Sequence, residues 1–527
     1  MSDLTCRCTP ASTTSAARIV AGVQSNYNSI AHRVTDLEET AEDHEERISE
    51  LESTITVNES PFTIVDNEAE FDAAIAAGKH ILLRGEGNGG EISLTGVKEL
   101  DVRGTKIWGY GYKSGSTDHF GKIKFDHPVI PNVGSANLYG LKINATDIEC
   151  GGFEVQGNDA LDLAKVSYIA FRLSTVADAA RFHLHDVTGY NLCQLVGKDG
   201  GNGSSITTDL TVERVYGYNL THHGVGIQNG LRNGKILHSR FIPKPSGFGL
   251  TFTTTKGVFM SADIHDTLID DVYVEGCAEL GIELTSTVIS GTTFNTMLRN
   301  RVRGCTTRDT SSFGISMVFA TDGMIDGCLV EDATGIGIES AGGFTVGQSN
   351  VPHNTTMIGN IVRGVVSDGG YASGISSDNT LGDIIEGNRV EDVASTFAGA
   401  NPHFYARGIL VYEALQTKVR GNKVREVDGI GCYVHTNSAG AANSLAVVEN
   451  NDFYVSSAST KATHAMLIFN SRAVVRNNVA WEPVSGVALQ KYECNINNPE
   501  RVHLGFDWTA DAQGNVLFNE SNLRLTY

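Results

Sequence analysis

Two acidic residues in neighbouring repeats carry the clearest chemical signal. Glu339 is the third residue of Gly337-Ile-Glu-Ser340, and Asp378 lies two residues beyond the matching position in Gly374-Ile-Ser-Ser377. If these segments stack as parallel strands, about 4.8 Å between strands and about 6.6 Å along the chain separate the two backbone positions by roughly 8 Å. The carboxyl groups of inverting glycosidases lie ~6.5–9.5 Å apart. We therefore predict that Glu339 and Asp378 form a catalytic acid–base pair.

This prediction depends on strand register. A shift of one residue would turn both carboxylates toward the interior. The plain alternative is that these residues only solvate an acidic surface, because the chain carries 61 acidic and 40 basic residues.

Further candidates for substrate binding lie on the same expected strand family. Aromatic rings can stack on the apolar faces of sugars, and carboxylates accept hydrogen bonds from hydroxyl groups. On this basis the predicted substrate-binding residues are Glu283, Tyr412, Glu413, Tyr433 and His435. Tyr412 and His435, with Arg407 nearby, would instead suit proton abstraction and β-elimination. If the chain cleaves its substrate, hydrolysis is favoured over elimination. Whether it cleaves at all stays open. Neither a metal nor a cofactor is expected.

A repeat of about 29 residues must position these side chains. Its core is an apolar residue, two variable residues, an Asn-like residue, one variable residue and a second apolar residue. Asn suits sharp turns because it tolerates the left-handed conformation, and stacked Asn side chains can hydrogen-bond between coils. The repeat centres that carry Asn are Asn300, Asn360, Asn388, Asn422, Asn451 and Asn477. The repeat predicts an all-β chain that folds as a right-handed parallel β-helix.

A second strand family follows in each repeat and is usually opened by glycine, as in Gly281-Ile-Glu-Leu284 and Gly408-Ile-Leu-Val411. Because successive side chains of a strand point to opposite faces, the residue after glycine is expected to point inward and the next outward. The candidate site therefore lies on the outer face of this strand family.

The N-terminal region carries a different pattern. Apolar or seam positions alternate at spacings of three and four residues, which predicts a coiled-coil helix over residues 20–57. The seam is Val20, Val23, Tyr27, Ile30, Val34, Leu37, Ala41, His44, Ile48, Leu51 and Ile55. The residue types at the seam favour a dimer by themselves, and an amphipathic helix packed on its own domain is the alternative. Residues 1–19 are expected to form an attachment segment.

The β-helix is expected over residues 58–494, with a short helix covering its first coil. Asn67 and Glu70 form a capping-box pattern, and Gly78 marks the helix end. Such a helix protects an open sheet edge from aggregation. Residues 495–527 are predicted to form a small β-rich end piece.

Composition excludes some classes of function. A net charge of −21 argues against nucleic acid or an anionic membrane as the main partner. No run of about 18 apolar residues predicts a membrane-spanning helix, and no secretion signal is visible at the N-terminus. Seven of the nine cysteines, from Cys150 to Cys494, are expected to be small buried hydrophobic residues in a reducing compartment. The role of Cys6 and Cys8 stays open.

The order of these elements resembles a known family. A heptad region, the capping helix Phe71-Asp-Ala-Ala-Ile-Ala-Ala-Gly-Lys-His-Ile-Leu-Leu83 and Asn-bearing coils are similar to the pectate-lyase-like β-helices of phage tailspikes and polysaccharide depolymerases. The resemblance implies a homotrimer attached by its N-terminus to a virion tail or baseplate protein. It also implies recognition of a host surface glycan, without membrane insertion, and synthesis in the host cytoplasm.

Two other functions remain open from the sequence. One is a free polysaccharide lyase or hydrolase, which would need an export signal and no long heptad stretch. The other is a non-enzymatic structural spike, which would have no affinity for glycans. Which glycan, which host and whether a site lies within one chain or between chains are not specified by the residues.

Overall fold

The structure is a computed structural model that describes much of the chain between residues 62 and 526. The predicted attachment segment (1–19) and coiled coil (20–57) lie outside the described residues. Described are 62–84, 91–110, 112–114, 117–119, 121–126, 138–157, 168–175, 179–198, 205–243, 255–286, 288–290, 293–294, 297–342, 354–367, 370, 372–397, 405–435, 445–455, 464–469, 472–482, 490–495, 502–504, 509–510, 516–517 and 524–526.

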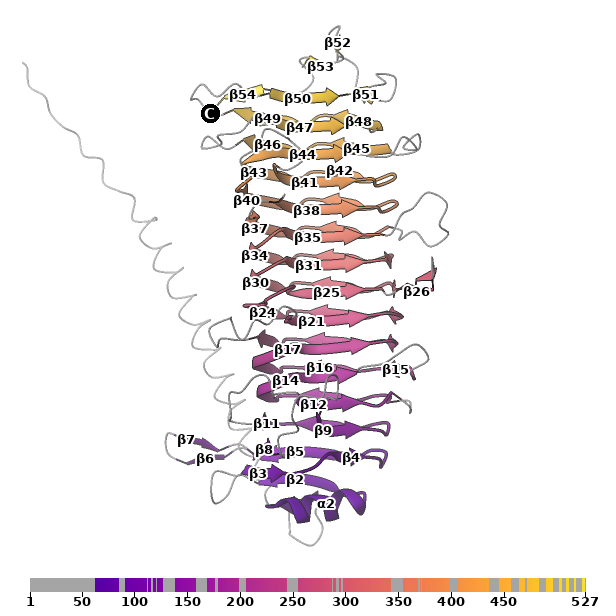
Figure 1. The fold of residues 1–527 in the computed structure, drawn as a ribbon, viewed down its shortest axis with the longest axis vertical. Coiled ribbons are helices and arrows are strands. Elements are labelled where there is room, and N and C mark those ends of the chain that lie inside the picture. Colours follow the sequence, from indigo (N-terminus) through magenta and orange to yellow (C-terminus); the bar gives the residue numbers. More distant parts are fainter. Residues whose placement is uncertain are drawn as a thin grey trace, which may run out of the picture. The chain divides into compact units, whose positions relative to one another are not determined.

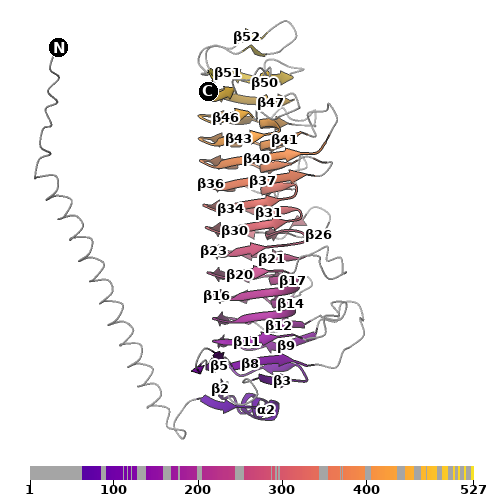
Figure 2. The same cartoon turned by 90° about the vertical axis from the view of Figure 1, so that its left-hand side faces the viewer.

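Parallel strands stack coil upon coil through the described part of residues 64–527, so this part is a parallel β-helix (Figures 1 and 2). One wall is a sixteen-stranded sheet. Its strands are β1 (Phe62–Val65), β2 (His80–Arg84), β5 (Lys106–Tyr110), β10 (Glu149–Gly151), β13 (His183–His185), β16 (Thr211–Glu213), β19 (Lys235–Leu237), β23 (Leu268–Asp270), β29 (Arg301–Arg303), β33 (Met324–Asp326), β36 (Thr356–Ile358), β39 (Ile384–Glu386), β42 (Lys418–Arg420), β45 (Leu445–Glu449), β48 (Arg472–Arg476) and β51 (Val502–Leu504).

A 27-stranded sheet forms two further walls, which we call the first and second branches. The long strands β14 (Thr188–Lys198) and β17 (Tyr216–Gln228) belong to both branches. The first branch also contains β3 (Glu91–Leu94), β8 (Gly121–Phe125), β11 (Phe153–Gln156), β20 (Arg240–Ile242), β24 (Tyr273–Glu275), β30 (Thr306–Thr310), β34 (Leu329–Ala333), β37 (Ile361–Ser367), β40 (Arg389–Ser395), β43 (Lys423–Val427), β46 (Asp452–Val455), β49 (Val479–Glu482) and β54 (Arg524–Thr526).

The second branch is the strand family on which the sequence placed the candidate site. It contains β4 (Lys98–Leu100), β9 (Leu138–Ile143), β12 (Tyr168–Leu173), β21 (Lys256–Ser261), β25 (Ile282–Thr285), β31 (Phe313–Val318), β35 (Ile336–Ala341), β38 (Ser373–Asp378), β41 (Ala406–Tyr412), β44 (Gly429–His435), β47 (His464–Phe469) and β50 (Gln490–Asn495).

Smaller sheets complete the described strands. A five-stranded parallel sheet at one corner holds β15 (Thr207–Thr208), β18 (Leu231–Arg232), β22 (Ile264–His265), β28 (Met297–Leu298) and β32 (Ala320–Thr321). Three antiparallel pairs are β6 (Tyr112–Ser114) with β7 (Thr117–His119), β26 (Val288–Ser290) with β27 (Thr293–Phe294), and β52 (Thr509–Ala510) with β53 (Val516–Leu517).

The interior is a continuous apolar column. Ile338, Ile375 and Ile409 are register partners on successive coils, and all three are fully buried. No coil can bury its inner face alone, so each depends on its neighbours for stability. Each of these isoleucines directly follows a glycine and points inward, as the predicted alternation of side chains requires.

An asparagine ladder runs along one inner corner. Asn360 donates from its backbone N and Nδ2 to Asn388 Oδ1, each at 2.9 Å. The same pattern continues from Asn388 to Asn422, from Asn422 to Asn451 and from Asn451 to Asn478. The predicted stacking of Asn360, Asn388, Asn422 and Asn451 is confirmed.

Two predicted ladder positions were wrong. Asn300 lies before β29 of the sixteen-stranded sheet and bonds to Thr267 N and Ile264 O, so it belongs to a different corner. Cys328 occupies the ladder position below Asn360, whose Oδ1 accepts from the Cys328 N–H at 2.8 Å. At the other end Asn478 carries the ladder, whereas Asn477 has a φ of 54° in the preceding turn.

Helix α2 (Glu68–Ala76) begins and ends where the sequence indicated. Asn67 accepts a 3.0 Å hydrogen bond from Glu70 N, and Glu70 accepts from Asp66 N at 2.8 Å. Gly78 follows with a φ of 64°, a conformation that favours glycine. Phe71 is fully buried, and the helix packs on β2, β3 and β4 at the first coil. The helix therefore covers the first coil.

The parallel stack extends past residue 494. β51 pairs in parallel with β48, and β54 pairs in parallel with β49. The predicted end piece over residues 495–527 therefore includes strands that continue the walls of the β-helix, beside the antiparallel pair β52–β53.

Cysteine burial, membrane-spanning helices and metal-binding clusters can each be checked in the described residues. Five cysteines are buried there, and burial raises the pKa of Cys150, Cys277 and Cys432. Among the described residues no helix has the length and apolar character to cross a bilayer, and no group of three or more His, Cys, Asp or Glu side chains has a metal-binding arrangement.

Candidate active site

Outward-pointing side chains of the second branch form three parallel columns. The central column follows the register of the strands from coil to coil. Its members are Gly226, Phe259, Glu283, Ser316, Glu339, Ser376, Leu410 and Tyr433. The trailing column lies two residues further along each strand and contains Ala341, Asp378, Tyr412 and His435. The leading column lies on the other side of the central one and contains Gln194, His223 and Lys256, then Ile336, Ser373, Arg407, Ile430 and His464.

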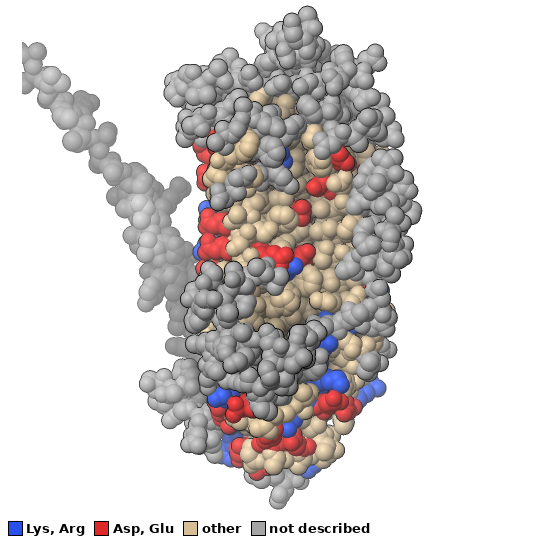
Figure 3. Space-filling model, viewed as in Figure 1, with Lys and Arg blue, Asp and Glu red and all other residues tan. Residues whose placement is uncertain are grey.

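Glu339 and Asp378 lie on adjacent coils with the predicted offset. Glu339 is the register partner of Ser376, and Asp378 is the register partner of Ala341. On the face seen in Figure 3, small acidic patches interrupt a mostly uncharged surface over the strands from β25 to β41. The strand arrangement therefore brings the two carboxylates into neighbouring columns of one face.

Glu339 is almost completely enclosed, with 8% of its surface exposed. Its Oε2 accepts a 2.7 Å hydrogen bond from the Ser316 hydroxyl on the preceding coil. Burial raises the pKa of Glu339 to about 7, and the negative charges of Asp378 and Glu283 act in the same direction. The Ser316 hydrogen bond opposes this shift because it favours the charged form.

The pKa of Asp378 is raised in a similar way, but to a lower value. Burial raises its pKa to about 6, and the charge of Glu413 adds to the effect. Asn379 Nδ2 donates to Asp378 Oδ1 at 2.6 Å, and both this bond and Arg407 favour the ionised carboxylate. Near neutral pH, Glu339 is about half protonated while Asp378 is mostly ionised. The two carboxyl groups, on adjacent coils, therefore differ in their tendency to hold a proton.

Ser376 is a polar neighbour that the predicted site did not include. It is 1% exposed, and its Oγ has no hydrogen-bond partner among the described residues. It pairs in register with Glu339 and precedes Asp378 by two residues. A buried hydroxyl without a partner costs free energy, so this position suits a bound hydroxyl group or water. Its place in the outward column was readable from the sequence, but its unmatched hydroxyl was not.

Glu283 lies two coils before Glu339 in the central column. Its Oε2 contacts the ammonium group of Lys256, which also lies 3.4 Å from Glu279 Oε2. Lys256 further lies 4.3 Å from the centre of the Phe259 ring. Glu283 is thus in the predicted column, but its carboxylate is already neutralised by a lysine.

Tyr433 needs a correction. Its side chain is fully buried in a separate apolar cluster on the outer face with Leu410, Ile430 and Leu467. Burial raises its pKa, and its ring stacks on His435 with centres 5.2 Å apart. A ring enclosed on this scale offers no face to a sugar, so we assign Tyr433 a packing role.

Tyr412, Glu413 and His435 gather at the trailing side. Tyr412 is half-buried, and its ring centre lies 5.2 Å from that of His435 on the next coil. Glu413 has a φ of 47°, and its backbone N donates to His435 O at 2.8 Å. Arg407 lies 5.0 Å above the Tyr433 ring. The groups considered for β-elimination are thus neighbours, although His435 is 6% exposed.

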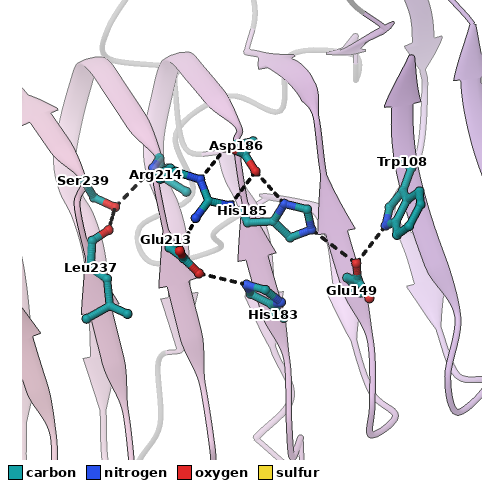
Figure 4. A network of polar contacts seen from close by, with 10 residues as sticks. Trp108, Glu149, His183, His185, Asp186, Glu213, Arg214, Leu237 and Ser239 are labelled. Atoms are coloured by element: carbon teal, nitrogen blue, oxygen red, sulfur yellow. Dashed lines mark hydrogen bonds and ion pairs between the residues drawn. The ribbon is translucent and has the colours of Figure 1, made fainter. Parts of the chain in front are cut away.

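A second polar network lies on the sixteen-stranded sheet and was missed by the sequence analysis (Figure 4). Trp108 Nε1 donates to Glu149 Oε1 at 3.0 Å, and His185 lies 3.3 Å from the same oxygen. His185 Nδ1 is 2.8 Å from Asp186, which also binds Arg214. These contacts join residues of successive coils, so we interpret the network as a set of cross-links between coils. Strand-to-strand register alone could have placed these residues together.

Comparisons with known proteins find solved structures that resemble this chain, but they find no family to which it belongs. No family model matches the chain, and no curated protein matches it. Among solved structures, the catalytic unit of a thermostable GH87 alpha-1,3-glucanase from Streptomyces thermodiastaticus is 12% identical, with a TM-score of 0.44. That match covers 84% of this chain and 66% of the glucanase unit.

Two other solved structures match this chain with similar sequence identities and TM-scores. The alginate lyase AlyF-OU02 is 10% identical over 88% of this chain and 90% of its own, with a TM-score of 0.45. A tailspike protein of Escherichia coli bacteriophage HK620, in complex with a hexasaccharide, is 11% identical over 83% of this chain and 76% of its own, with a TM-score of 0.43.

Proposed function

We propose that this chain recognises a polysaccharide on the outer face of the second branch and hydrolyses it at Glu339 and Asp378. The observation that carries the proposal is the pair itself: two carboxyl groups on adjacent coils, Glu339 buried and Asp378 half-buried, with pKa values raised to about 7 and about 6. Perturbed carboxyl pairs of this kind suit proton transfer near neutral pH.

The two groups would have different roles. Glu339, the group with the higher pKa, donates a proton to the glycosidic oxygen as the bond to the anomeric carbon breaks. Asp378 takes a proton from a water molecule, whose oxygen forms the new bond to that carbon. We propose that the two carboxyl groups have the ~6.5–9.5 Å separation of inverting enzymes, which leaves room for a water molecule between the base and the sugar and gives a product of inverted configuration.

The proposals on assembly and attachment rest on the sequence. The heptads of residues 20–57 favour an oligomer, and the order of elements resembles trimeric tailspikes. We therefore propose a homotrimer that attaches through residues 1–19 to a virion tail or baseplate and binds a host surface glycan. Sedimentation of the full chain is expected to give three times the chain mass of 56.4 kDa. A monomer at micromolar concentration would contradict the trimer.

The proposed hydrolysis can be tested with a panel of polysaccharides. Neutral glucans, mannans and galactans, together with alginate, polygalacturonate and hyaluronan, are incubated with the full chain, and new reducing ends are measured. Products that absorb near the ultraviolet band of an unsaturated uronate would indicate elimination instead.

Three variants complete this test. Glu339→Gln and Asp378→Asn are expected to lose about 10²–10⁴-fold in rate while binding is kept, because each loses one proton-transfer group. The matched control is Glu386→Gln, on the sixteen-stranded sheet, where the carboxylate pairs with Arg420 at 2.8 Å. Binding without cleavage by the wild-type chain would favour a non-enzymatic receptor-binding spike, and neither binding nor cleavage would favour a structural one.

A further inference from the structure

The outer face of the second branch continues past Glu283 toward lower-numbered coils. Gln194 on β14, His223 on β17 and Lys256 on β21 are register partners in the leading column. Beside them in the central column lie Gly226 and Phe259. This stretch is in line with the Glu339–Asp378 pair but three to five coils away, which is about 14–24 Å at a coil spacing of about 4.8 Å.

Gln194 and His223 each hold a buried polar atom without a partner. Both side chains are 2% exposed. Gln194 Nε2 lies 2.9 Å from His222 Nδ1, but Gln194 Oε1 and His223 Nδ1 have no hydrogen-bond partner among the described residues. Unmatched buried polar atoms lower stability, and they are uncommon in folded proteins unless a ligand or water completes them.

Glycines hold these two side chains against the sheet. A Cβ atom on Gly197 would lie 2.6 Å from Gln194 Oε1, and one on Gly226 would lie 2.7 Å from His223 Cδ2. Both approaches are too close for any other residue without a shift of the side chains. The two glycines therefore leave room for the Gln194 and His223 side chains to lie close over the backbone.

A partly exposed aromatic rim borders the pair. The ring centres of His222 and His223 lie 3.7 Å apart, and the Phe259 ring on the next coil has its centre 5.0 Å from that of His223. His222 and Phe259 are both half-buried, so each ring has some surface open to solvent. An aromatic face next to hydrogen-bonding atoms is an arrangement that binds the apolar face of a sugar ring together with its hydroxyl groups.

The charges of this stretch point to an uncharged ligand. Burial, with the charges of His222 and Lys256, lowers the pKa of His223 well below its usual range, so its imidazole is neutral. Lys256 is paired with Glu283 and Glu279. No cation among these residues is left over to bind a carboxylate or sulfate.

We propose that Gln194 and His223, with Phe259, form a distal subsite for an uncharged sugar unit of the polysaccharide cut at Glu339. The proposal rests on the proposed function for the location of the cut. Gln194 Oε1 accepts from a sugar hydroxyl or amide N–H, His223 Nδ1 makes a second bond, and Phe259 stacks on the ring. The productive ligand is then a neutral chain long enough to span several coils.

Binding of size-graded fragments tests the subsite. The probe is the neutral polysaccharide of the panel that the wild-type chain cuts, fractionated into fragments of two or three sugars and of eight or more. Affinities are measured by calorimetry on the full chain carrying Glu339→Gln, alone and with His223→Phe or Gln194→Met added. The added substitutions are expected to weaken binding of long fragments about three- to tenfold, the range for one hydrogen bond, and to leave short fragments unchanged.

Matched controls and a stability measurement make the test decisive. Gln416→Met and His238→Phe, both on exposed turns, are expected to change neither affinity. Because His223→Phe removes an unmatched buried atom and keeps the ring, its melting temperature is expected to be equal to or above that of the parent. Equal loss for short and long fragments, no loss for long ones, or a lowered melting temperature of His223→Phe would overturn the subsite. Absence of any cut or bound polysaccharide, with the melting temperatures as expected, would instead count against the proposed function.

Discussion

The Ser316 hydroxyl donates a 2.7 Å hydrogen bond to Glu339 Oε2 from the preceding coil, and both side chains are enclosed on the outer face of the β-helix. This bond is the one interaction that counteracts the rise in the pKa of Glu339 caused by burial and by neighbouring carboxylates. The serine therefore limits how far burial and the neighbouring carboxylates raise the pKa of Glu339.

Replacement of Ser316 by alanine is expected to raise the pKa of Glu339 further, because the charged form loses its hydrogen bond. The alkaline limb of the pH–rate profile should move to higher pH, while the acid limb stays in place. The measurement is kcat/KM against pH with the polysaccharide that the wild type cuts. Ser311→Ala, at an exposed position of the same coil, serves as the control, and an unchanged alkaline limb in Ser316→Ala would count against Glu339 as the acid.

The wild-type profile itself should be narrow and bell-shaped. Activity requires Asp378 ionised and Glu339 protonated, so it falls below about pH 6 and above about pH 7. In Asp378→Asn the acid limb should disappear together with most of the activity. A rate that keeps rising to about pH 9 would be inconsistent with a carboxylic acid as the proton donor.

Asp383 offers a test of stability directly behind the site. Its fully buried carboxylate accepts from Thr355 N at 3.1 Å and from the Ser377 hydroxyl at 2.9 Å, and Ser377 precedes Asp378. Burial raises the pKa of Asp383 to about 6. Because the fold favours the protonated form, the native state loses stability as the pH rises from the unfolded pKa near 4 through about 6.

Asp383→Asn should remove this pH-dependent loss. The difference in the free energy of unfolding between variant and wild type is expected to shift in favour of the variant by up to roughly 3 kcal/mol from about pH 4 to about pH 8. Urea unfolding at the two pH values measures it. Asp452→Asn, at an outer edge of the first branch, is the control, and a pH-independent difference for Asp383→Asn would disprove a raised pKa.

The asparagine ladder should carry part of the stability of the last coils. Asn422→Ala removes the Oδ1 atom that accepts from Asn388 N and Nδ2, and it removes the Nδ2 bond to Ile385 O. Buried donors without partners are expected to cost about 3 kcal/mol in total. The same change at Asn233, whose exposed side chain bonds to Asp209 at 3.1 Å, should cost only about 1 kcal/mol, chiefly because its φ of 55° disfavours alanine. Equal losses in the two variants would show that the ladder adds nothing to stability.

Much of the fold could be predicted from the sequence because its signals are local and repeated. The glycine at the second position of strands such as β35 and β38 indicated the register, and so the relation between Glu339 and Asp378. The capping pattern of Asn67 and Glu70 identified helix α2 for a similar reason. The error at Asn300 arose because the same short pattern occurs at two different corners of a coil, and composition alone does not tell the corners apart.

The features that the sequence failed to predict depend on several coils at once. Tyr433 is buried because Leu410 and Leu467 lie on the coils before and after it, and enclosure of that kind leaves no mark in a single repeat. The raised pKa of Glu339 and the unmatched atoms of Gln194 and His223 likewise follow from packing between coils. Sequence periodicity predicts which way a side chain points, but not how deeply its neighbours cover it.

The stereochemistry of the product tests the central claim most directly. Proton NMR of the sugar ends released in the first minutes of reaction would follow the newly formed anomeric centre. With Glu339 as acid and Asp378 as base, the first product should have inverted configuration, and it should be absent in both Glu339→Gln and Asp378→Asn. A retained configuration, an unsaturated product, or undiminished release by either variant would contradict this assignment.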